Sequence, residues 1–197
     1  MRAFVAVELS ESIREALAGL IGSLRRLDLP VKWVAPENLH LTLKFLGNVP
    51  DETMTDVVGI VRRCTEGATP FELAVAGVGG FPSFQRPRVV FVESVESPPT
   101  LRELARCLNR RMTRAGVPRE NRPFRSHITL GRVRRPRPIG HAARELEALG
   151  ERSFGAMIVE GITLMKSDLT PDGPVYTPIE RVALTAAPGA DATTPHH

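Results

Sequence analysis

Hydrophobic and polar positions along the chain follow two different periods, which predict a mixture of strands and helices. Residues 3–8 alternate as a half-buried strand does, whereas apolar residues over 11–26 recur every three or four positions, as on one face of a helix. Further strands are expected over 39–46, 71–78, 88–95, 127–133, 157–165 and 176–184. Further helices are expected over 51–64, 101–112 and 139–149, and residues 28–36 are expected to form a connection.

The two halves of this pattern resemble each other. Each half places a helix before a strand that begins with His, an aliphatic residue, Thr and Leu, at residues 40–43 and again at 127–130. The similarity indicates a weak internal repeat. We therefore expect one bilobal domain over residues 1–185, in which two similar lobes face a common groove. Residues 186–197 are small, polar and contain proline, so a disordered tail is expected there, with the final His-His pair as part of the tail or a tag remnant.

Length and charge add little to these predictions of fold. With 197 residues and 42% hydrophobic content, the chain is long enough to bury a core. The net charge of +4 suits a polyanionic partner, but all except three of the 26 basic residues are arginine, a bias that genome composition alone produces. The charge therefore only supports an argument made on other grounds.

Several classes of protein are disfavoured. No apolar run approaches the ~20 residues that cross a bilayer, and the N-terminus has no signal-peptide pattern, so a cytoplasmic protein with no membrane contact is expected. Cys64 and Cys107 stand alone on predicted helices without the spacing of a zinc site, and we expect them to be small buried hydrophobes. A phosphate loop and a Lys-x-Asp-Gly nucleophile motif are both missing, which argues against an ATP-dependent ligase.

The two His-x-Thr motifs have the side chains that cleavage of a cyclic phosphate needs. Strand alternation puts His40, Thr42 and Lys44 on one face of their strand and puts Leu41, Leu43 and Phe45 on the other. His127 and Thr129 share a face in the same way. Two opposed histidines serve as general acid and general base, and the threonine hydroxyls donate hydrogen bonds to the phosphate oxygens. This scheme requires neither a metal nor a cofactor.

With these motifs, the sequence resembles the two-histidine (2H) phosphoesterases, and among them the RNA 2',3'-cyclic phosphodiesterases, also called 2'-5' RNA ligases. The similarity extends from residues 4–7 through 33–38, 81–91 and 124–127 to 164–176. It implies an α+β fold in which two antiparallel sheets, with helices outside, flank the groove. It also implies that His40 donates a proton to the leaving O3' and that His127 activates water, giving a 2'-phosphate. Because the site is nearly symmetric, the two histidines could also exchange these roles. Ligation without ATP would be the reverse reaction.

Other residues are candidates for contact with RNA. Phe45 and Arg132 each lie five residues after a motif histidine, and both would border the groove if the strand ends contain a bulge. The alternative is that Phe45 is core and Arg132 is solvated. Arg125 and the arginines near it would hold the RNA backbone, or they form a solvated loop, and the arginines at helical spacing over 102–114 are expected to be an ordinary exposed face.

Three functions remain open at this stage. The first is hydrolysis of RNA 2',3'-cyclic phosphate ends, single-stranded or tRNA-like, by a monomer. The second keeps the chemistry but acts on small cyclic nucleotides. The third is a non-catalytic module that binds RNA ends, which the presence of both histidines disfavours because binding alone is possible with arginine.

Overall fold

The computed structural model of the chain describes residues 1–27, 29–95, 98–134, 138–171 and 173–185. The tail expected over 186–197 lies outside these ranges. In the described residues no helix is long and apolar enough to span a membrane.

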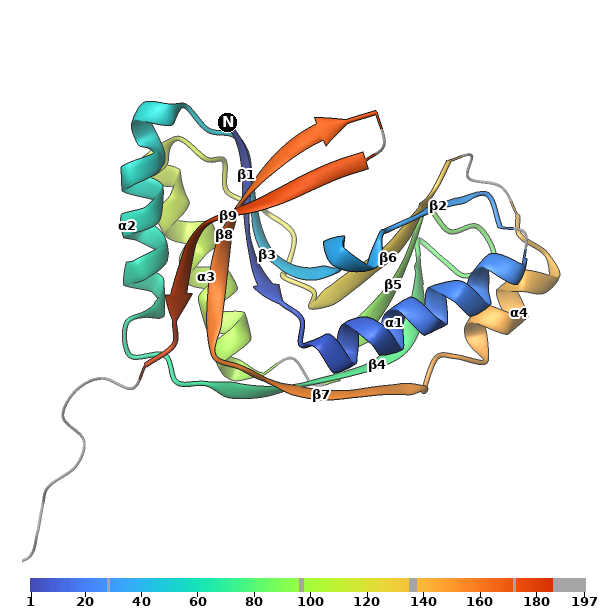
Figure 1. The fold of residues 1–197 in the computed structure, drawn as a ribbon. Helices are drawn as coiled ribbons and strands as arrows, with labels where there is room; N and C mark the ends of the chain where they lie inside the picture. The colour runs from blue at the N-terminus through green and yellow to red at the C-terminus, as the bar shows by residue number, and fades with distance from the viewer. Residues whose placement is uncertain (28, 96–97, 135–137, 172, 186–197) are drawn as a thin grey trace, which may run out of the picture.

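The strands pair into one curled antiparallel sheet, with the order β7-β4-β5-β6-β3-β1-β8-β9 and with β2 beside β6 (Figure 1). Their bounds are Arg2–Glu8 (β1), Val31–Trp33 (β2), His40–Asn48 (β3), Phe71–Phe81 (β4), Val89–Ser94 (β5), His127–Val133 (β6), Ser153–Val159 (β7), Gly161–Thr170 (β8) and Gly173–Ala183 (β9). The two halves of the sheet meet at a single residue pair, Leu41 with Ile128. We call β1, β3, β8 and β9 the first lobe, and β2, β4, β5, β6 and β7 the second lobe. The expected α+β antiparallel fold is confirmed, and the two expected sheets are joined through the pair of Leu41 and Ile128 into one.

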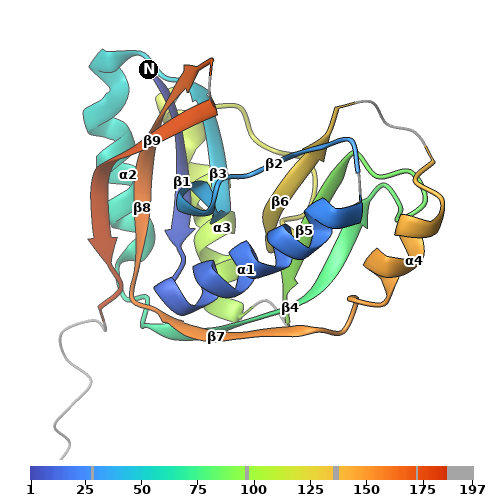
Figure 2. The same cartoon turned by 45° about the vertical axis from the view of Figure 1, so that its right-hand side comes forward.

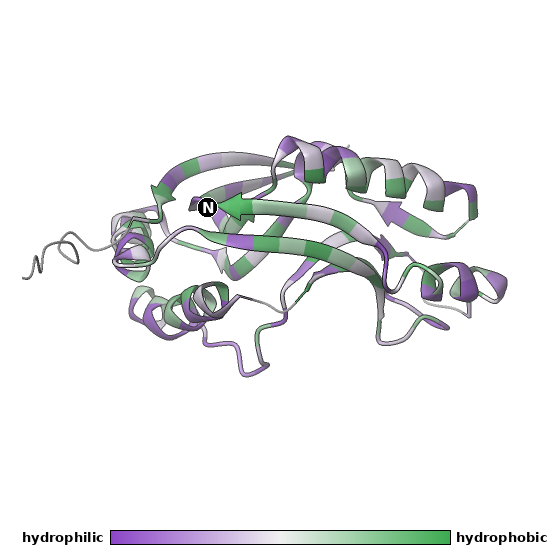
Figure 3. Cartoon of the chain, turned by 90° about the horizontal axis from the view of Figure 1, so that it is seen from below, coloured by the Kyte–Doolittle hydropathy of each residue, from purple (hydrophilic) through white to green (hydrophobic). Residues whose placement is uncertain are grey.

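Four α-helices pack on the strands in the described residues: α1 (Glu11–Leu24), α2 (Met54–Thr65), α3 (Pro99–Arg111) and α4 (His141–Glu147). Helices α2 and α3 contact each other beside the first lobe, while α1 contacts β7 and α4 contacts β4 in the second lobe (Figure 2). Each helix carries hydrophobic and hydrophilic residues on different faces (Figure 3). The predicted helices therefore form because their apolar stripes are buried against the sheet.

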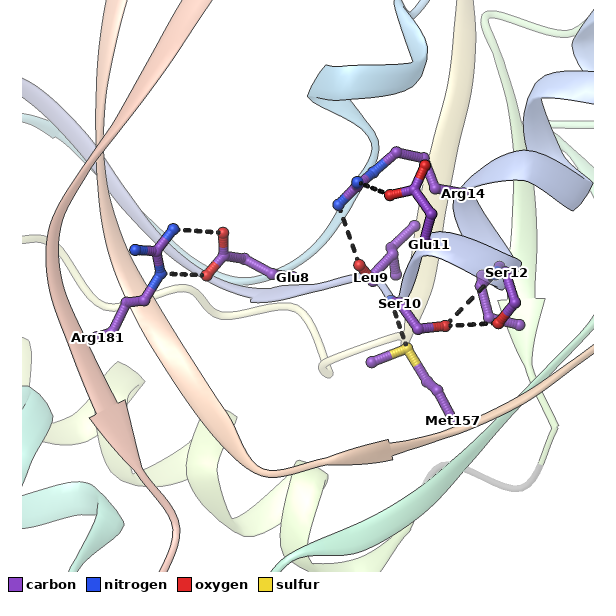
Figure 4. Close-up of polar contacts among 9 residues, drawn as sticks. Glu8, Leu9, Ser10, Glu11, Ser12, Arg14, Met157 and Arg181 are labelled. Atoms are coloured by element: carbon purple, nitrogen blue, oxygen red, sulfur yellow. Dashed lines mark hydrogen bonds and ion pairs between the residues drawn. The ribbon is translucent and has the colours of Figure 1, made fainter.

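The junction between β1 and α1 shows how a helix start is fixed (Figure 4). The Ser10 hydroxyl caps α1 by accepting a hydrogen bond from the backbone N–H of Ile13 at 3.4 Å. Just before it, Glu8 at the end of β1 accepts hydrogen bonds from Arg181 of β9 at 2.9 and 3.3 Å. The end of β1 is therefore tied to the edge of the first lobe.

Two expectations about strands were wrong in detail. The predicted strand over 157–165 is divided at Glu160, because β7 pairs with β4 in the second lobe while β8 pairs with β1 in the first. The predicted connection over 28–36 contains the short strand β2, which pairs with β6. Three residues are too few for a periodic pattern to reveal a strand.

The expectation that both cysteines are simple buried hydrophobes was also wrong. Cys64 in α2 and Cys107 in α3 form a disulfide, with their Cα atoms 5.7 Å apart. The helical assignment of both residues was correct, but the neighbouring position of α2 and α3 is a tertiary feature. A separation of 43 residues gives no sign of it.

Candidate active site

The two motifs meet where the lobes join. Leu41 and Ile128 form the pair that connects β3 to β6, and both are almost completely buried in the core. Side chains alternate along a strand, so the His and Thr residues on either side of this pair point to the opposite face. Counted outward from the pair in antiparallel register, Thr42 corresponds to His127 and Thr129 corresponds to His40. Each histidine is thus adjacent to the threonine of the other motif, and Thr42 and His127 line one cavity together.

Both histidine rings are held in the same way. The Nδ1 atom of His40 lies 2.8 Å from the carbonyl oxygen of Asn38, and Nδ1 of His127 lies 2.8 Å from the carbonyl oxygen of Arg125. A carbonyl oxygen can only accept, so Nδ1 carries the hydrogen and donates it in each ring. The Nε2 atom of each histidine is therefore the nitrogen that can take up or release a proton.

Aromatic rings enclose His40. The centroid of the Phe4 ring lies 4.7 Å from that of His40, and the ring of Tyr176 meets His40 edge-on at 5.3 Å. Burial lowers the pKa of His40 below its ordinary value of 6.5, the bond to Asn38 acts in the opposite direction, and the charge of His127 lowers the pKa further. The pairing of β3 with β6, which brings the two motifs together, accounts for this effect of His127 on His40.

His127 has different neighbours. The Phe91 ring of β5 meets it edge-on with centroids 5.6 Å apart. The guanidinium of Arg125 lies over the same Phe91 ring, 5.2 Å from the centroid, and is paired with the carboxylate of Glu93. Arg125 is thus near the second motif, as expected, but its charge already has an acidic partner.

A matching irregularity follows each motif. The pairing of β1 with β3 skips Leu43, and the pairing of β5 with β6 skips Leu130, so each strand contains a bulge at the leucine that directly follows its threonine. The bulge reverses the alternation beyond it. Phe45 is consequently 53% exposed and Arg132 is exposed, which confirms the expected bulge and excludes a core position for Phe45.

The bulge also corrects the position of Lys44. Strand alternation predicted that Lys44 shares the face of His40, yet its side chain is only 2% exposed. Its Nζ atom donates to the carbonyl oxygen of Pro118 at 3.0 Å and pairs with Glu120 at 2.9 Å. Lys44 therefore holds the segment that leads into β6.

Two cavities with different linings lie near the motifs. One, of about 340 Å³, is called the phenylalanine cavity here, and it is lined by Thr42, Phe45, Phe81, Phe91, Phe124, Arg125 and His127, among others. The other, of about 420 Å³, includes Trp33, Asn38, Arg132 and Tyr176. Phe45 and Arg132 thus border different cavities.

The sequence did not point to Phe4, Tyr176 or Phe91 as neighbours of the histidines. Each belongs to a strand that has an ordinary hydrophobic pattern, and only strand pairing brings it to the site. Across the described ranges, no three His, Cys, Asp or Glu side chains gather where they could hold a metal ion.

Comparison with known proteins bears on both the repeat and the chemistry. The family model described as LigT like phosphoesterase matches the chain twice, over residues 7–91 and 92–176, so each match contains one His-x-Thr motif. Several curated relatives carry the name RNA 2',3'-cyclic phosphodiesterase. That of Methanothermobacter thermautotrophicus is 38% identical over 91% of this chain and 97% of its own length. That of Thermus thermophilus is 37% identical over 97% of this chain and 94% of its own.

Solved structures agree with these matches. The crystal structure of a protein of Thermus thermophilus superposes with a TM-score of 0.80 at 34% identity, covering 94% of this chain and 99% of that one. Escherichia coli LigT complexed with 3'-AMP superposes with a TM-score of 0.74 at 30% identity, covering 93% of this chain and 98% of that one.

Proposed function

The chain belongs to the LigT-like phosphoesterase family, and we propose from this premise that it is an RNA 2',3'-cyclic phosphodiesterase that converts cyclic phosphate ends to 2'-phosphate ends. The observation that carries the proposal is the pairing of β3 with β6 at Leu41 and Ile128. That pairing sets two histidines, each with Nε2 available, on the same face as two threonines.

The hydrolysis assigns one proton transfer to each histidine. The Nε2 atom of His127 accepts a proton from water as the water oxygen forms a bond to phosphorus. The bond between phosphorus and O3' breaks, and the Nε2 atom of His40 donates a proton to O3'. One histidine must be protonated and the other neutral, so the reactive form of the site carries a single proton.

The threonines stabilise the charge on the phosphate. Thr42 and Thr129 each present a hydroxyl beside the histidine of the other motif and can donate hydrogen bonds to the non-bridging oxygens. Removal of one such donor from a preorganised site typically costs about a hundredfold in kcat. The reverse reaction, in which a 5'-hydroxyl replaces water, would join RNA ends without ATP at the same site.

The test is incubation of the purified protein, with EDTA present, with an RNA oligonucleotide that ends in a 2',3'-cyclic phosphate, followed by analysis of the product ends. We expect a 2'-phosphate only. A 3'-phosphate product would contradict the direction of ring opening, and hydrolysis of cyclic mononucleotides alone would favour a small cyclic nucleotide as substrate. Binding of the end without conversion would indicate an RNA-binding module.

A further inference from the structure

A third cavity continues the site away from the histidines. It has a volume of about 420 Å³ and lies between α3 and the segment 119–124, and we call it the arginine cavity. It shares residues with the phenylalanine cavity, so the two are neighbours along one surface. The shared residues are Leu43, Lys44, Glu120, Arg122, Pro123 and Phe124.

The two neighbouring cavities differ in their chemistry. The phenylalanine cavity contains four phenylalanine side chains, of which Phe45 and Phe81 are about half exposed. The arginine cavity is lined by five basic side chains and one acidic one. These are Lys44, Arg102, Arg106, Arg119, Arg122 and Glu120. Aromatic faces beside a basic groove are the combination that binds single-stranded nucleic acid, because bases stack and phosphates are neutralised.

The acidic member of the arginine cavity is already engaged. The Glu120 carboxylate pairs with Lys44 and forms no ion pair with Arg106, Arg119 or Arg122 among the described residues. Within the described part of the chain, Arg106, Arg119 and Arg122 form no ion pair, and all three are exposed. Their charges are therefore available to a ligand.

The segment that carries Arg119 and Arg122 is fixed at both sides. Asn109 of α3 exchanges two hydrogen bonds of 2.8 Å with the backbone of Glu120, donating to its carbonyl oxygen and accepting from its N–H. Lys44 of β3 binds the same segment from the other side. A preorganised backbone reduces the entropy lost when a flexible strand binds.

We propose that the RNA strand upstream of the cyclic phosphate runs from the histidine pair through the phenylalanine cavity into the arginine cavity, with Arg106 and Arg119 contacting its phosphates. This rests on the proposed function and names its substrate as an oligonucleotide. Arg106 belongs to the arginine row that was expected from the sequence to be an ordinary exposed face, and it thus contributes to the substrate track.

The test compares a cyclic mononucleotide with cyclic-phosphate oligonucleotides of two to eight residues. In the wild-type protein we expect kcat/KM to rise with length and then level off. In the double variant Arg106→Gln/Arg119→Gln, KM for the octanucleotide should rise about tenfold relative to KM for the mononucleotide. The slope of log KM against log salt should fall by about 1.4, since each contact to a single strand contributes about 0.7.

A matched control removes the same charge elsewhere. Arg63 and Arg114 line a separate cavity with Asp56, and Arg63→Gln/Arg114→Gln should leave both KM values and the salt slope unchanged. Equal kcat/KM for all substrate lengths in the wild-type protein would overturn the proposed substrate track but not the proposed function. Equal KM changes in the two double variants would have the same meaning. No hydrolysis of any substrate by the wild-type protein would instead overturn the proposed function.

Discussion

At the scale of single residues, Tyr176 is one of the two aromatic residues that enclose His40, together with Phe4. Burial of His40 lowers its pKa, and the Tyr176 ring contributes to that burial. The reactive site carries one proton, so the rate falls at low pH when both histidines are protonated, and the lowered pKa of His40 moves this acid limb to lower pH. We therefore expect the acid limb of kcat/KM to lie below pH 6.5, the ordinary value.

Tyr176→Ala should move that limb upward toward 6.5, because water then reaches the His40 imidazolium and stabilises it. Tyr176→Phe keeps the ring and should leave the limb in place. A profile of kcat/KM against pH for the three proteins measures this. An unchanged limb in Tyr176→Ala would show that another group sets it.

Arg132 offers a second test at this scale. It is exposed, borders the cavity that contains Tyr176, and lowers the pKa of Tyr176 through its charge against the larger, opposite effect of burial. Arg132→Ala should raise KM for an oligonucleotide, by roughly tenfold if a base stacks on the guanidinium. Arg134→Ala, directly after the same strand, is the control. An unchanged KM in Arg132→Ala would remove this residue from the substrate site.

The position of the two motif histidines on one face of the sheet could be predicted from the sequence, whereas their surroundings could not. His40 and His127 stand in short motifs with a repeated hydrophobic framing. Phe4 and Tyr176 come from β1 and β9, at opposite ends of the chain, and look like ordinary strand residues. Their role depends on pairing between distant strands, which a local pattern does not contain.

At the scale of elements, the segment before β6 depends on one buried lysine. Loss of the Glu120 carboxylate would leave the Lys44 ammonium, which is 2% exposed, with only the carbonyl of Pro118. Glu120→Ala should therefore lower the free energy of unfolding by about 1–3 kcal/mol. It should also reduce kcat/KM, because the segment leads to His127.

Asp168→Ala is the matched control, since it breaks the exposed pair with Lys166 and should cost about 0.5 kcal/mol or less. Urea denaturation of both variants provides the comparison. Equal small losses would mean that the pair of Lys44 and Glu120 does not hold the segment.

The element boundaries show where periodicity is sufficient. Most helices and strands were predicted close to their observed bounds because each has one buried face, whereas the boundary between β7 and β8 was missed. The bulges at Leu43 and Leu130 were predicted only as a condition for Phe45 and Arg132 to reach the groove. The buried position of Lys44 was missed, because side chains alternate between the two faces of a strand only where its pairing with the neighbouring strand is regular.

At the scale of the whole molecule, the chain order differs from the spatial order of the lobes. The first lobe is built from β1 and β3 together with β8 and β9, and the segment from β4 to β7 supplies most of the second lobe. The internal repeat was visible in the sequence, and the family model matches it as two adjacent copies. The exchange of strands between the lobes was not visible in the sequence, because the spacing of residues along the chain does not show which strands pair.

The disulfide joins two helices beside the first lobe and closes a loop of 43 residues. In the chain-entropy model, such a link contributes about 4 kcal/mol, and measured values are commonly about 2–4 kcal/mol. A reducing agent should lower the stability of the wild-type protein by that order, while Cys107→Ser should be insensitive to it. Two titratable thiols in protein purified without reductant would contradict the link.

The division of labour between the two histidines is the central claim, and leaving-group chemistry tests it most directly. The measurement is the hydrolysis rate of a cyclic-phosphate RNA and of its analogue with sulfur in place of O3', for the wild-type protein, His40→Ala and His127→Ala. Both variants should lose about 10²–10⁴-fold on the normal substrate. A thiolate leaves without a proton, so the analogue should restore His40→Ala and leave His127→Ala impaired. Restoration of His127→Ala alone would exchange the roles, and a wild-type rate in either variant on the normal substrate would contradict the two-histidine mechanism.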